Sequence, residues 1–514
     1  MIPQNNKYVL GIDLGTTYSS VAVFKADGVG VISNNSSNFS TPSFVTFTDD
    51  EVYVGEEAKT QALVDLKRIV FDVKRMIGKK FNDLSIQEGM KLWPFKVVSD
   101  GVGDPLIEIN INDQIKHFSP EEISSYILKE MKTIAVDHLG QDVKDAIISV
   151  PAGFDCNQRL STRKAGELAG LNVLRIVDEP TAAAIGYGIN AKIDTNMKIL
   201  VFDFGGGTLD VSLLSTEKNN FDVIATACDP HLGGQDIDNN IMKHLADICR
   251  TKYGTDFLVK PRSVFTIQQK IEQAKITLSK NMKYNIFCPN LCDGKDFEYT
   301  LTREEFEKIN QDLFDRILDP VKRVLHDSEL PKESIDEIIL VGGSSKIPRV
   351  KDILSEYFGK SPKHGVDPYL AVAIGAAILG HDIIRNGGNI IRYQSVIPHD
   401  IGVETSGGNM FVLIHKNTRI PTQKSEIFTT ASHYQEQVKI KVFMGDDKKT
   451  ENNTLLGEFL LGNIKKAELG DPQINVIFKI DQEGILEVSA KDIETGANEK
   501  ETMKIMGNDD AERK

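Results

Sequence analysis

The feature that most constrains the fold of this chain is an internal repeat. The matching pairs of segments are GIDLGTTYSSVAVF (11–24) with VFDFGGGTLDVSLL (201–214), DAIISVPAG (145–153) with DEIILVGGS (336–344), and EPTAAAIGYG (179–188) with DPYLAVAIGA (367–376). Their offsets are 190, 191 and 188 residues. One short apolar match would mean little, but three at nearly one offset predict that the first three-quarters of the chain is duplicated.

Each half is expected to form an α/β lobe, with the halves at about 1–192 and 193–385. Short continuous apolar runs in both halves are typical of strands that are covered on both faces. The segment 265–280 is a predicted helix, whose apolar face comprises Ile267, Ile271, Ala274 and Leu278. Two similar lobes joined by a hinge form a deep cleft, and ligands commonly bind in such clefts.

The chain changes character after about residue 385. Residues 381–398 contain a glycine pair and a proline and indicate a connector, within which 386–396 is the predicted interdomain linker. Short strands with alternating apolar residues follow, as in QVKIKVFMG (437–445). We therefore expect an all-β sandwich over 397–507 and a charged stub over 508–514.

Composition excludes several classes of partner. The formal net charge of −14 argues against a nucleic-acid partner, because neutralising phosphates requires a basic face. No run is apolar and long enough for a membrane span or a secretory signal, so we expect no membrane partner and a cytoplasmic location. The five cysteines form no CxxC pair and are expected to be reduced thiols, although Cys288 and Cys292 could be half of a metal site.

The two copies of the first repeated segment predict a phosphate site. In the first copy, Gly15 permits close backbone approach, and successive N–H groups with Thr16 and Thr17 can cradle a phosphate. The carboxylate of Asp13 would repel phosphate oxygens unless a cation intervened, and Mg²⁺ suits that position. The second copy supplies the matching set Asp203, Gly205, Gly206, Gly207 and Thr208.

Two such hairpins that face each other would form a clamp for a nucleoside triphosphate. The alternative is a pair of ordinary acidic hairpins that bind nothing, which is credible for one copy and much less so for a repeated pair. The chain has no GxxxxGK[ST] motif, so a P-loop enzyme is not expected. A small-molecule kinase with the same duplicated fold would not explain the β-rich segment.

The motifs occur in the order found in the seventy-kilodalton heat-shock, DnaK-type chaperones, and the chain resembles that family from residue 8 to about 507. The motifs that carry the resemblance are GIDLGTTYSSVAVF, FDVKRMIG (71–78), VDEPTAAAIGYG (177–188), VFDFGGGTLDVS (201–212), HLGGQDIDN (231–239) and LVGGSSKIP (340–348). The resemblance implies a duplicated actin-like α/β ATPase with ribonuclease H-like lobes, followed by an all-β sandwich peptide-binding domain. It also implies an ATP-dependent chaperone of protein folding and the stress response, which binds extended apolar segments and hydrolyses ATP to ADP and phosphate.

The resemblance assigns a hydrolytic set to this chain. Lys74 would lie beside the γ-phosphate and help to set the attacking water, and Glu179 would lie near that water. Asp13, Asp203 and Glu179 would hold Mg²⁺ mostly through its waters, and K⁺ is a further candidate ion. Thr208 would contact the γ-phosphate.

The remaining nucleotide contacts are also implied by the resemblance, with Asp210 as a further acid behind Thr208. The residues that would bind ATP or ADP are Gly15, Thr16, Thr17, Tyr18, Gly205, Gly206, Gly207, Thr208, Gly233, Gly234, Glu272, Lys275, Ser279, Gly342, Gly343, Ser344 and Lys346. The family stacks arginines on the adenine where this chain has Ile276 and Lys346. Because an isoleucine supplies no cation–π attraction, a weaker affinity for nucleotide is expected.

The β-rich segment resembles the peptide-binding domain of the family through DIGVETSGGNMFVLIHKNTRIPT (400–422), EIFTTAS (426–432), VKIKVFMGDD (438–447), LLGEFLLGNI (455–464) and QEGILEVSA (482–490). The family grips an extended apolar peptide by β-like backbone bonds. The implied peptide-binding residues are Ile401, Val403, Phe428, Val438, Ile440, Ile474 and Val476. The alternative is that they are core residues of the sandwich, above all Ile440 and Val476.

Coupling between nucleotide and peptide is where the chain departs furthest from the family. The linker keeps two isoleucines but has Arg392, Tyr393 and Gln394 in place of leucines and Ser395 in place of an aspartate. Burying an unpaired arginine is costly, so a poorly populated docked state is expected. The relay proline and arginine of the family match Pro151 and Arg159, whereas its tyrosine is Gly153 in this chain.

The implied partners are unfolded or nascent polypeptides, a J-domain co-chaperone on the Arg175 side and a nucleotide-exchange factor. The family continues into a helical lid, and the sequence stops where that lid would begin, so fast peptide exchange is expected. The altered linker leaves an alternative function open. The chain could be a regulatory or ribosome-associated member that binds ATP, couples it weakly to peptide and assists another chaperone.

Overall fold

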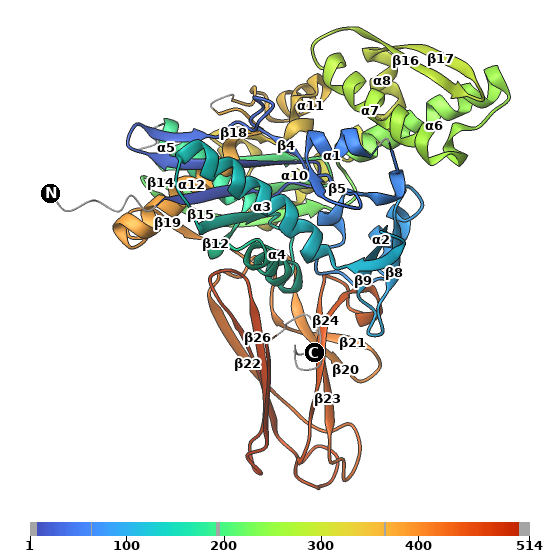
Figure 1. Ribbon diagram of the computed structural model, residues 1–514. Helices are drawn as coiled ribbons and strands as arrows, with labels where there is room; N and C mark the ends of the chain where they lie inside the picture. Colours follow the sequence, from blue (N-terminus) through green and yellow to red (C-terminus); the bar gives the residue numbers. More distant parts are fainter. Residues whose placement is uncertain (1–7, 63, 192–195, 364–365, 503–514) are drawn as a thin grey trace.

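The computed structural model describes residues 8–62, 64–191, 196–363 and 366–502, and the predicted charged stub lies outside them. Two central sheets dominate the larger part of the molecule (Figure 1). The first has the order β12 (Asn172–Asp178), β11 (Asp145–Val150), β1 (Val9–Asp13), β2 (Tyr18–Lys25) and β3 (Gly28–Val31), with β4 (Thr41–Pro42) paired to β2. The second has the order β18 (Glu337–Val341), β13 (Met197–Phe204), β14 (Leu209–Glu217), β15 (Asn220–Asp229) and β19 (Arg392–Gln394).

The strand order explains the internal repeat. In each sheet an antiparallel hairpin, β1–β2 or β13–β14, has a parallel neighbour on its other side, β11 or β18. The equivalent acids therefore occupy equivalent positions, because Asp13 pairs in register with Ser149 and Asp203 with Val341. The structure agrees with a mixed α/β fold that carries two related sheets.

Two helices join the central sheets into one body. Helices α5 (Glu179–Ala191) and α12 (Ala371–Asn386) share a buried apolar cluster with β1 and β11 of the first sheet and with β13 and β18 of the second. The helices approach very closely at Gly375, where a Cβ atom would lie 1.7 Å from the carbonyl oxygen of Ala182. Helix α12 continues to Asn386, so the first residues of the predicted connector are helical.

Further elements extend each half. The first half carries the sheet β8 (Lys96–Ser99), β9 (Pro105–Ile111) and β10 (Gln114–Phe118), the small sheet β6 (Val52–Val54), β5 (Val45–Phe47) and β7 (Ile69–Val70), and helices α1 (Glu56–Gln61), α2 (Leu84–Gly89), α3 (Pro120–Leu139) and α4 (Cys156–Leu168). The second half carries the hairpin β16 (Lys283–Cys292) and β17 (Lys295–Thr302) and helices α6 (Gly234–Tyr253), α7 (Pro261–Leu278), α8 (Arg303–Ile309), α9 (Gln311–Arg316), α10 (Leu318–Asp327) and α11 (Pro348–Phe358). All four residues of the predicted apolar face of 265–280 are buried in α7.

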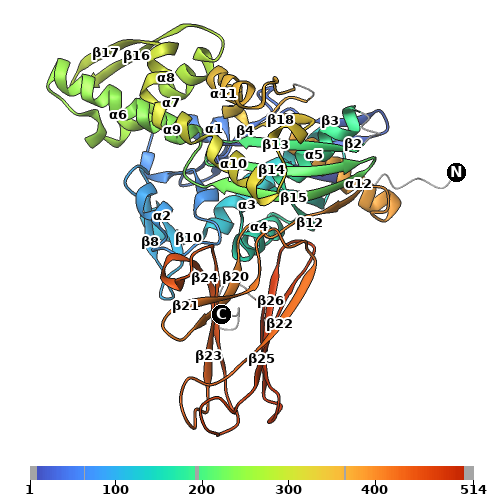
Figure 2. The same ribbon diagram turned by 180° about the vertical axis from the view of Figure 1, so that it is seen from behind.

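Two four-stranded sheets pack beneath helix α4, as the orange and red ribbons show (Figures 1 and 2). One has the order β21 (Asn409–Ile414), β20 (Ile401–Thr405), β23 (Val438–Met444) and β24 (Thr454–Leu461). The other has the order β22 (Thr422–Phe428), β25 (Ile474–Ile480), β26 (Leu486–Asp492) and β27 (Asn498–Thr502). A single apolar core lies between them, and Cys156 of α4 belongs to the same cluster.

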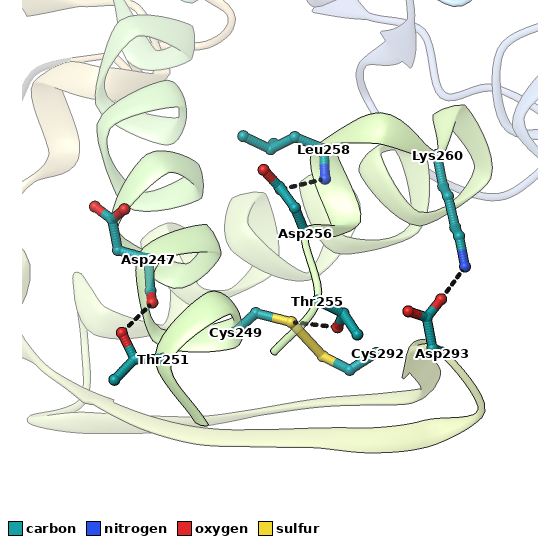
Figure 3. The surroundings of a disulfide bond; sticks show 9 residues. All are labelled: Asp247, Cys249, Thr251, Thr255, Asp256, Leu258, Lys260, Cys292 and Asp293. Atoms are coloured by element: carbon teal, nitrogen blue, oxygen red, sulfur yellow. Dashed lines mark hydrogen bonds and ion pairs between the residues drawn. A yellow bond between two sulfur atoms is a disulfide. The ribbon is translucent and has the colours of Figure 1, made fainter. Parts of the chain in front are cut away.

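A disulfide bond corrects the expectation that all the cysteines are reduced thiols. Cys249, near the end of α6, is bonded to Cys292 at the end of β16, while Cys156, Cys228 and Cys288 are free (Figure 3). The bond closes a segment with a sequence separation of 43 residues that contains the whole of α7. Sequence spacing could not predict this pair, because only the packing of α6 against the hairpin brings the two cysteines together.

No helix in the described ranges combines the length and the apolar character that crossing a membrane requires.

Candidate functional site

A cavity of about 350 Å³ lies between the two central sheets. Its walls include both repeated hairpin loops, helix α7 and the segment that follows β18. The predicted site residues among its lining are Asp13, Gly15, Thr16, Thr17, Tyr18, Lys74, Glu179, Asp203, Gly205, Gly206, Gly207, Thr208, Glu272, Lys275, Ile276, Ser279, Gly342, Gly343, Ser344 and Lys346. Residues that are far apart in the sequence are thus brought to one cavity.

The loops of the two hairpins touch each other at one end of this cavity. A Cβ atom built on Gly206 would lie 2.1 Å from the hydroxyl oxygen of Thr17, and one on Gly207 would lie 3.1 Å from that of Thr16. Only glycine allows this approach, so the backbone N–H groups and the threonine hydroxyls of both loops converge. The hydroxyl of Thr17 has no hydrogen-bond partner although it is buried. This arrangement fits a phosphate chain.

A cluster of buried acids adjoins the loops. Lys74 Nζ lies 2.5 Å from Glu179 Oε1, and the hydroxyl of Ser149 donates to Asp13 over 3.3 Å. Burial and then the neighbouring Glu179 carboxylate raise the pKa of Asp13 to about 7. Burial also raises the pKa of Asp203 well above the usual carboxyl range, and Glu179 adds to that effect.

Lys74 is the counter-ion of this cluster. Burial disfavours its charged form, but Glu179, Asp13 and Asp203 outweigh that effect and raise its pKa. The backbone places the ammonium here through a short 3₁₀ turn, Val73–Arg75, in which Val73 and Lys74 are buried. One ammonium group facing several buried carboxylates leaves excess negative charge in this part of the cavity.

The cluster fits a bound cation. Asp210 Oδ1 is buried without a hydrogen-bond partner, while its Oδ2 accepts from the Thr208 hydroxyl over 2.8 Å. Within the described part of the chain, no three His, Cys, Asp or Glu side chains converge closely enough to hold a metal ion directly. If Mg²⁺ binds here, Asp13, Asp203 and Glu179 are the carboxylates that would hold it, and this ion favours binding through its own water molecules beside phosphates.

Three predicted residues lie just outside the cavity wall. Asp210 lies behind Thr208, and burial together with Glu179 raises its pKa to about 7. Gly233 and Gly234 begin helix α6, and the N–H of Gly234 donates to the Gly205 carbonyl over 3.0 Å. They support the second hairpin loop instead of lining the cavity.

Contacts across the cavity connect the two halves. The Tyr18 hydroxyl donates to Glu272 Oε1 over 2.9 Å, and Lys59 Nζ lies 3.7 Å from Glu272 Oε2. Arg75 Nη2 lies 3.4 Å from the carbonyl oxygen of Gly207 and donates to it. The side chain of Gln235 donates to Asp72. These contacts hold α7 and the second loop against the first half.

Sequence reasoning missed several residues of this site. Gln235, Asp238 and Tyr369 line the cavity, and Asp238 Oδ2 accepts from Lys275 Nζ over 2.5 Å. Gln235 and Asp238 lie within the quoted motif HLGGQDIDN, whose chemistry was assigned only to its glycines. Tyr369 lies within the third repeated segment, and its aromatic ring was the available signal.

The predicted peptide-binding residues lie in the core between the two sheets of the β-rich part. Five of them are buried there, namely Ile401, Val403, Ile440, Ile474 and Val476. Phe428 and Val438 are half-buried at the edge of this core. In this arrangement the five buried side chains act as core residues, so their contact with a peptide stays a prediction.

The linker is docked in this structure, and the arginine whose burial was expected to oppose docking is exposed. How far the docked state is populated stays a prediction. Strand β19 adds to the second central sheet in parallel with β15, pairing Tyr393 with Phe221. Arg392 is exposed, so no arginine charge is buried, and Ile391 is 6% exposed and packs in the cluster between the sheets. The expected cost of docking assumed that all three replaced leucine positions face inward, and they do not.

Polar contacts fix the linker to the first half as well. The Ser395 hydroxyl donates to Asp178, whose other oxygen pairs with Arg159 over 2.6 Å. Arg175, the predicted co-chaperone residue, donates to the Tyr393 hydroxyl over 3.4 Å and lies 5.7 Å from the centre of its ring. The predicted relay residue Arg159 thus connects the linker to the strand that ends beside Glu179.

The β-rich part contacts both halves beyond the linker. Arg163 pairs with Glu483, and Asn157 Nδ2 donates to the carbonyl oxygen of Leu456 over 3.0 Å. Lys416 Nζ lies 2.8 Å from Asp327 Oδ2 in the second half. The docked arrangement therefore includes ion pairs to each half.

Comparison with known proteins agrees with this architecture. The family model described as "Hsp70 protein" matches residues 9–514. A heat shock 70 kDa protein of Emericella nidulans is 46% identical over 498 residues, which cover 96% of this chain and 77% of that protein. A heat shock 70 kDa protein of Neurospora crassa is 46% identical over 492 residues, covering 95% of this chain and 76% of that protein. Heat shock 70 kDa protein 2 of Paracoccidioides lutzii is 45% identical over 496 residues, covering 96% and 76%. The chain therefore belongs to the Hsp70 family, whose members are ATPases that act as chaperones.

Proposed function

We propose that this chain binds extended apolar segments of unfolded polypeptides and hydrolyses ATP to ADP and phosphate to control that binding. The observation that carries the proposal is the convergence of Lys74, Glu179, Asp13 and Asp203 beside two touching glycine loops. This is a set of groups that can hold a triphosphate and a water molecule in one geometry, which is the main requirement of phosphoryl transfer.

Each part of the site has a role in this proposal. The N–H groups and hydroxyls of both loops bind the phosphate oxygens, and Thr208 contacts the γ-phosphate. Lys74 and Glu179 orient the attacking water, because the ammonium donates hydrogen bonds and the carboxylate accepts a proton. Mg²⁺, when bound, neutralises charge on the phosphates and orients them.

The docked linker supports control of peptide binding by nucleotide. Strand β19 belongs to the same sheet as β13 and β14, whose connecting loop lines the cavity. Ile391 of the linker packs between the two sheets, and Ser395 donates a hydrogen bond to Asp178. A change in the separation of the sheets would therefore alter the contacts that hold the linker. Release of the linker would free the β-rich part from α4. A J-domain partner at Arg175 would compete with Tyr393 for that side chain.

The test is steady-state ATP hydrolysis by the full chain with and without a saturating apolar peptide. Hydrolysis that peptide stimulates several-fold, and that Lys74→Ala removes, supports the proposal. Hydrolysis that is lost in Lys74→Ala but indifferent to peptide would instead favour the regulatory or ribosome-associated function. Failure of Mg²⁺ and ATP to bind at all would contradict both.

A further inference from the structure

A part of the cavity wall outside the two hairpin loops includes a tyrosine. Tyr369 lies in the turn before α12, and its ring lines the cavity together with Gly343, Lys346 and Ile276. Ile276 is 41% exposed on α7 and offers an apolar side chain to the cavity. Tyr369 is half-buried, and burial followed by the nearby Glu272 carboxylate raises its pKa. The ring is therefore neutral near pH 7.

Three contacts hold this ring in one position. Lys346 Nζ lies 4.2 Å from the ring centre, and the same ammonium pairs with Asp367 Oδ1 over 2.8 Å. The backbone N–H of Tyr369 donates to that carboxylate oxygen over 3.0 Å. A Cβ atom built on Gly343 would lie 2.5–2.7 Å from ring atoms of Tyr369, so the ring rests directly on the glycine backbone.

In this arrangement Lys346 lines the cavity with its charge paired. Its ammonium lies between Asp367 and the tyrosine ring, so part of its charge is neutralised before a ligand binds. The uncharged groups in this part of the wall are an aromatic ring, an isoleucine and a glycine backbone, and the Glu272 carboxylate lies nearby. Such surfaces recognise a flat heteroaromatic ring by stacking, with little dependence on charge.

We propose that Tyr369 is the stacking platform for the base of the bound nucleotide, with Lys346 and Asp367 as the residues that position its ring. The inference rests on the proposed function, because it requires that the cavity binds a nucleotide. It goes beyond that function by naming the residue that distinguishes a nucleotide from a bare phosphate chain. The alternative is that Tyr369 only fills space.

The test compares two ligands on the full chain by titration calorimetry, Mg²⁺ with ATP and Mg²⁺ with inorganic tripolyphosphate. Tyr369→Ala should weaken ATP binding by about 5- to 100-fold, the range that loss of base–aromatic stacking gives. Tripolyphosphate binding should not change, because the phosphate loops are intact. Tyr369→Phe should stay within about twofold of the wild type for both ligands, since the ring and not the hydroxyl does the stacking.

Two further variants test the positioning of the ring. Gly343→Ala should displace the ring and lower the ratio of ATP affinity to tripolyphosphate affinity in the same way as Tyr369→Ala. Lys346→Met should lower that ratio by a smaller factor, because the Tyr369 ring stays in the cavity wall and loses only the contact with the ammonium. The matched control is Tyr357→Ala, since Tyr357 also lies under a lysine, Lys332 at 4.8 Å, but does not line the cavity.

Several outcomes would overturn the inference. ATP affinity that is unchanged or higher in Tyr369→Ala would show that the ring only fills space. A parallel loss of both ligands in Tyr369→Ala, Gly343→Ala and Lys346→Met would show general damage to the cavity. If the wild-type chain binds ATP no more tightly than tripolyphosphate, the proposal that Tyr369 stacks on the base is refuted. The proposal that the hairpin loops bind phosphate is not affected by that result. A wild-type chain that binds neither ligand refutes the proposed function and the platform with it.

Discussion

Asp178 and Glu179 are consecutive residues, yet their carboxylates serve two different parts of the molecule. Asp178 ends strand β12 and accepts hydrogen bonds from Arg159 and from the linker residue Ser395. Glu179 begins helix α5 and pairs with Lys74 in the cavity. A single peptide bond thus connects Asp178, which binds the linker, to Glu179, which we propose orients the attacking water.

This proximity offers a short physical route for coupling. Both carboxylates are buried, so neither can move far without losing a charged partner. Movement of Glu179 as ATP binds or is hydrolysed would shift Asp178 as well, and with it the contact to Ser395. Coupling of this kind needs two arrangements that each ligand stabilises differently.

The first prediction concerns Lys74. Lys74→Met should lower ATP turnover by about 100-fold or more, because it removes both a hydrogen-bond donor to the attacking water and a charge from the site. It should also lower the Tm of the nucleotide-free chain, since Glu179 would be left buried without its counter-ion, a loss that costs about 3–5 kcal/mol in buried pairs. The sequence did not indicate this cost, because the burial of Lys74 could not be seen in it.

The measurement is thermal unfolding and single-turnover hydrolysis of both proteins. The control is Lys80→Met, because Lys80 also pairs with an acid, Asp104 at 2.6 Å, but is exposed and outside the cavity. Wild-type turnover in Lys74→Met would refute its proposed role. An unchanged Tm would contradict the expected cost of leaving Glu179 buried without its counter-ion.

The second prediction is that the acid cluster destabilises the chain in the absence of Mg²⁺ and ATP. Asp13 has a pKa of about 7 in the folded chain against 3.8 for an ordinary aspartate, so between these values the folded state binds more protons. Stability should then fall as the pH rises from about 4 to 7. Asp13→Asn removes one such charge and should raise the ligand-free Tm at pH 8, by about 1 °C for each ~1 kcal/mol gained in a domain of this size.

At pH 5 the gain from Asp13→Asn should shrink, because Asp13 of the wild type is protonated there. The Tm of Asp13→Asn should also rise less than that of the wild type when Mg²⁺ and ATP are added, because the variant lacks one carboxylate proposed to hold the hydrated ion. Thermal unfolding at both pH values, with and without Mg²⁺ and ATP, checks both statements. A gain that is equal at pH 5 and pH 8 would contradict the charge argument.

The third prediction is that the chain carries three free thiols and one disulfide. Protein alkylated at the moment of lysis and then unfolded without reductant should show Cys249 and Cys292 unmodified, and Cys156, Cys228 and Cys288 modified. Closing a segment of this length is worth up to about 4 kcal/mol in the unfolded chain, so Cys249→Ser with Cys292→Ser should lower Tm. Five modified cysteines would instead restore the expectation of reduced thiols.

Sequence patterns predicted the elements of the fold better than its contacts. The apolar face of α7 and the strands β23 and β25 follow from periodicity, because burial selects those positions directly. Strand β19 did not follow, since three residues of mixed polarity carry no pattern, and only the free edge of β15 makes them a strand. The pairing of Cys249 with Cys292 depends likewise on the packing of α6 against the β16–β17 hairpin.

The candidate site shows the same limit at the level of single residues. Residue type and spacing in the repeated hairpins indicated Asp13 and Asp203, and the resemblance to the family added Lys74. They did not indicate Tyr369, whose position depends on Gly343 and Lys346 from a different segment. Nor did they show that Arg392 faces solvent, which removes the expected cost of burying its charge.

The last prediction tests the docked linker. Tyr393 pairs with β15, packs in the cluster between the sheets and lies over Arg175, whereas its neighbour Arg392 is exposed. Tyr393→Ala should therefore release the linker and reduce peptide stimulation of ATP hydrolysis several-fold. Arg392→Leu, the matched control, should change stimulation by less than about twofold, because exposed substitutions away from buried features have small effects.

Both variants should bind ATP as the wild type does, since neither residue lines the cavity. The readouts are the ratio of ATP hydrolysis with and without a saturating apolar peptide, and the rate at which a protease cuts at 387–396. Faster cutting in Tyr393→Ala alone is expected, because an undocked strand exposes its backbone. Equal stimulation in Tyr393→Ala and the wild type would show that coupling does not run through β19. Loss of stimulation in Arg392→Leu as well would show that the exposed face of the linker has a role that docking on β15 does not explain.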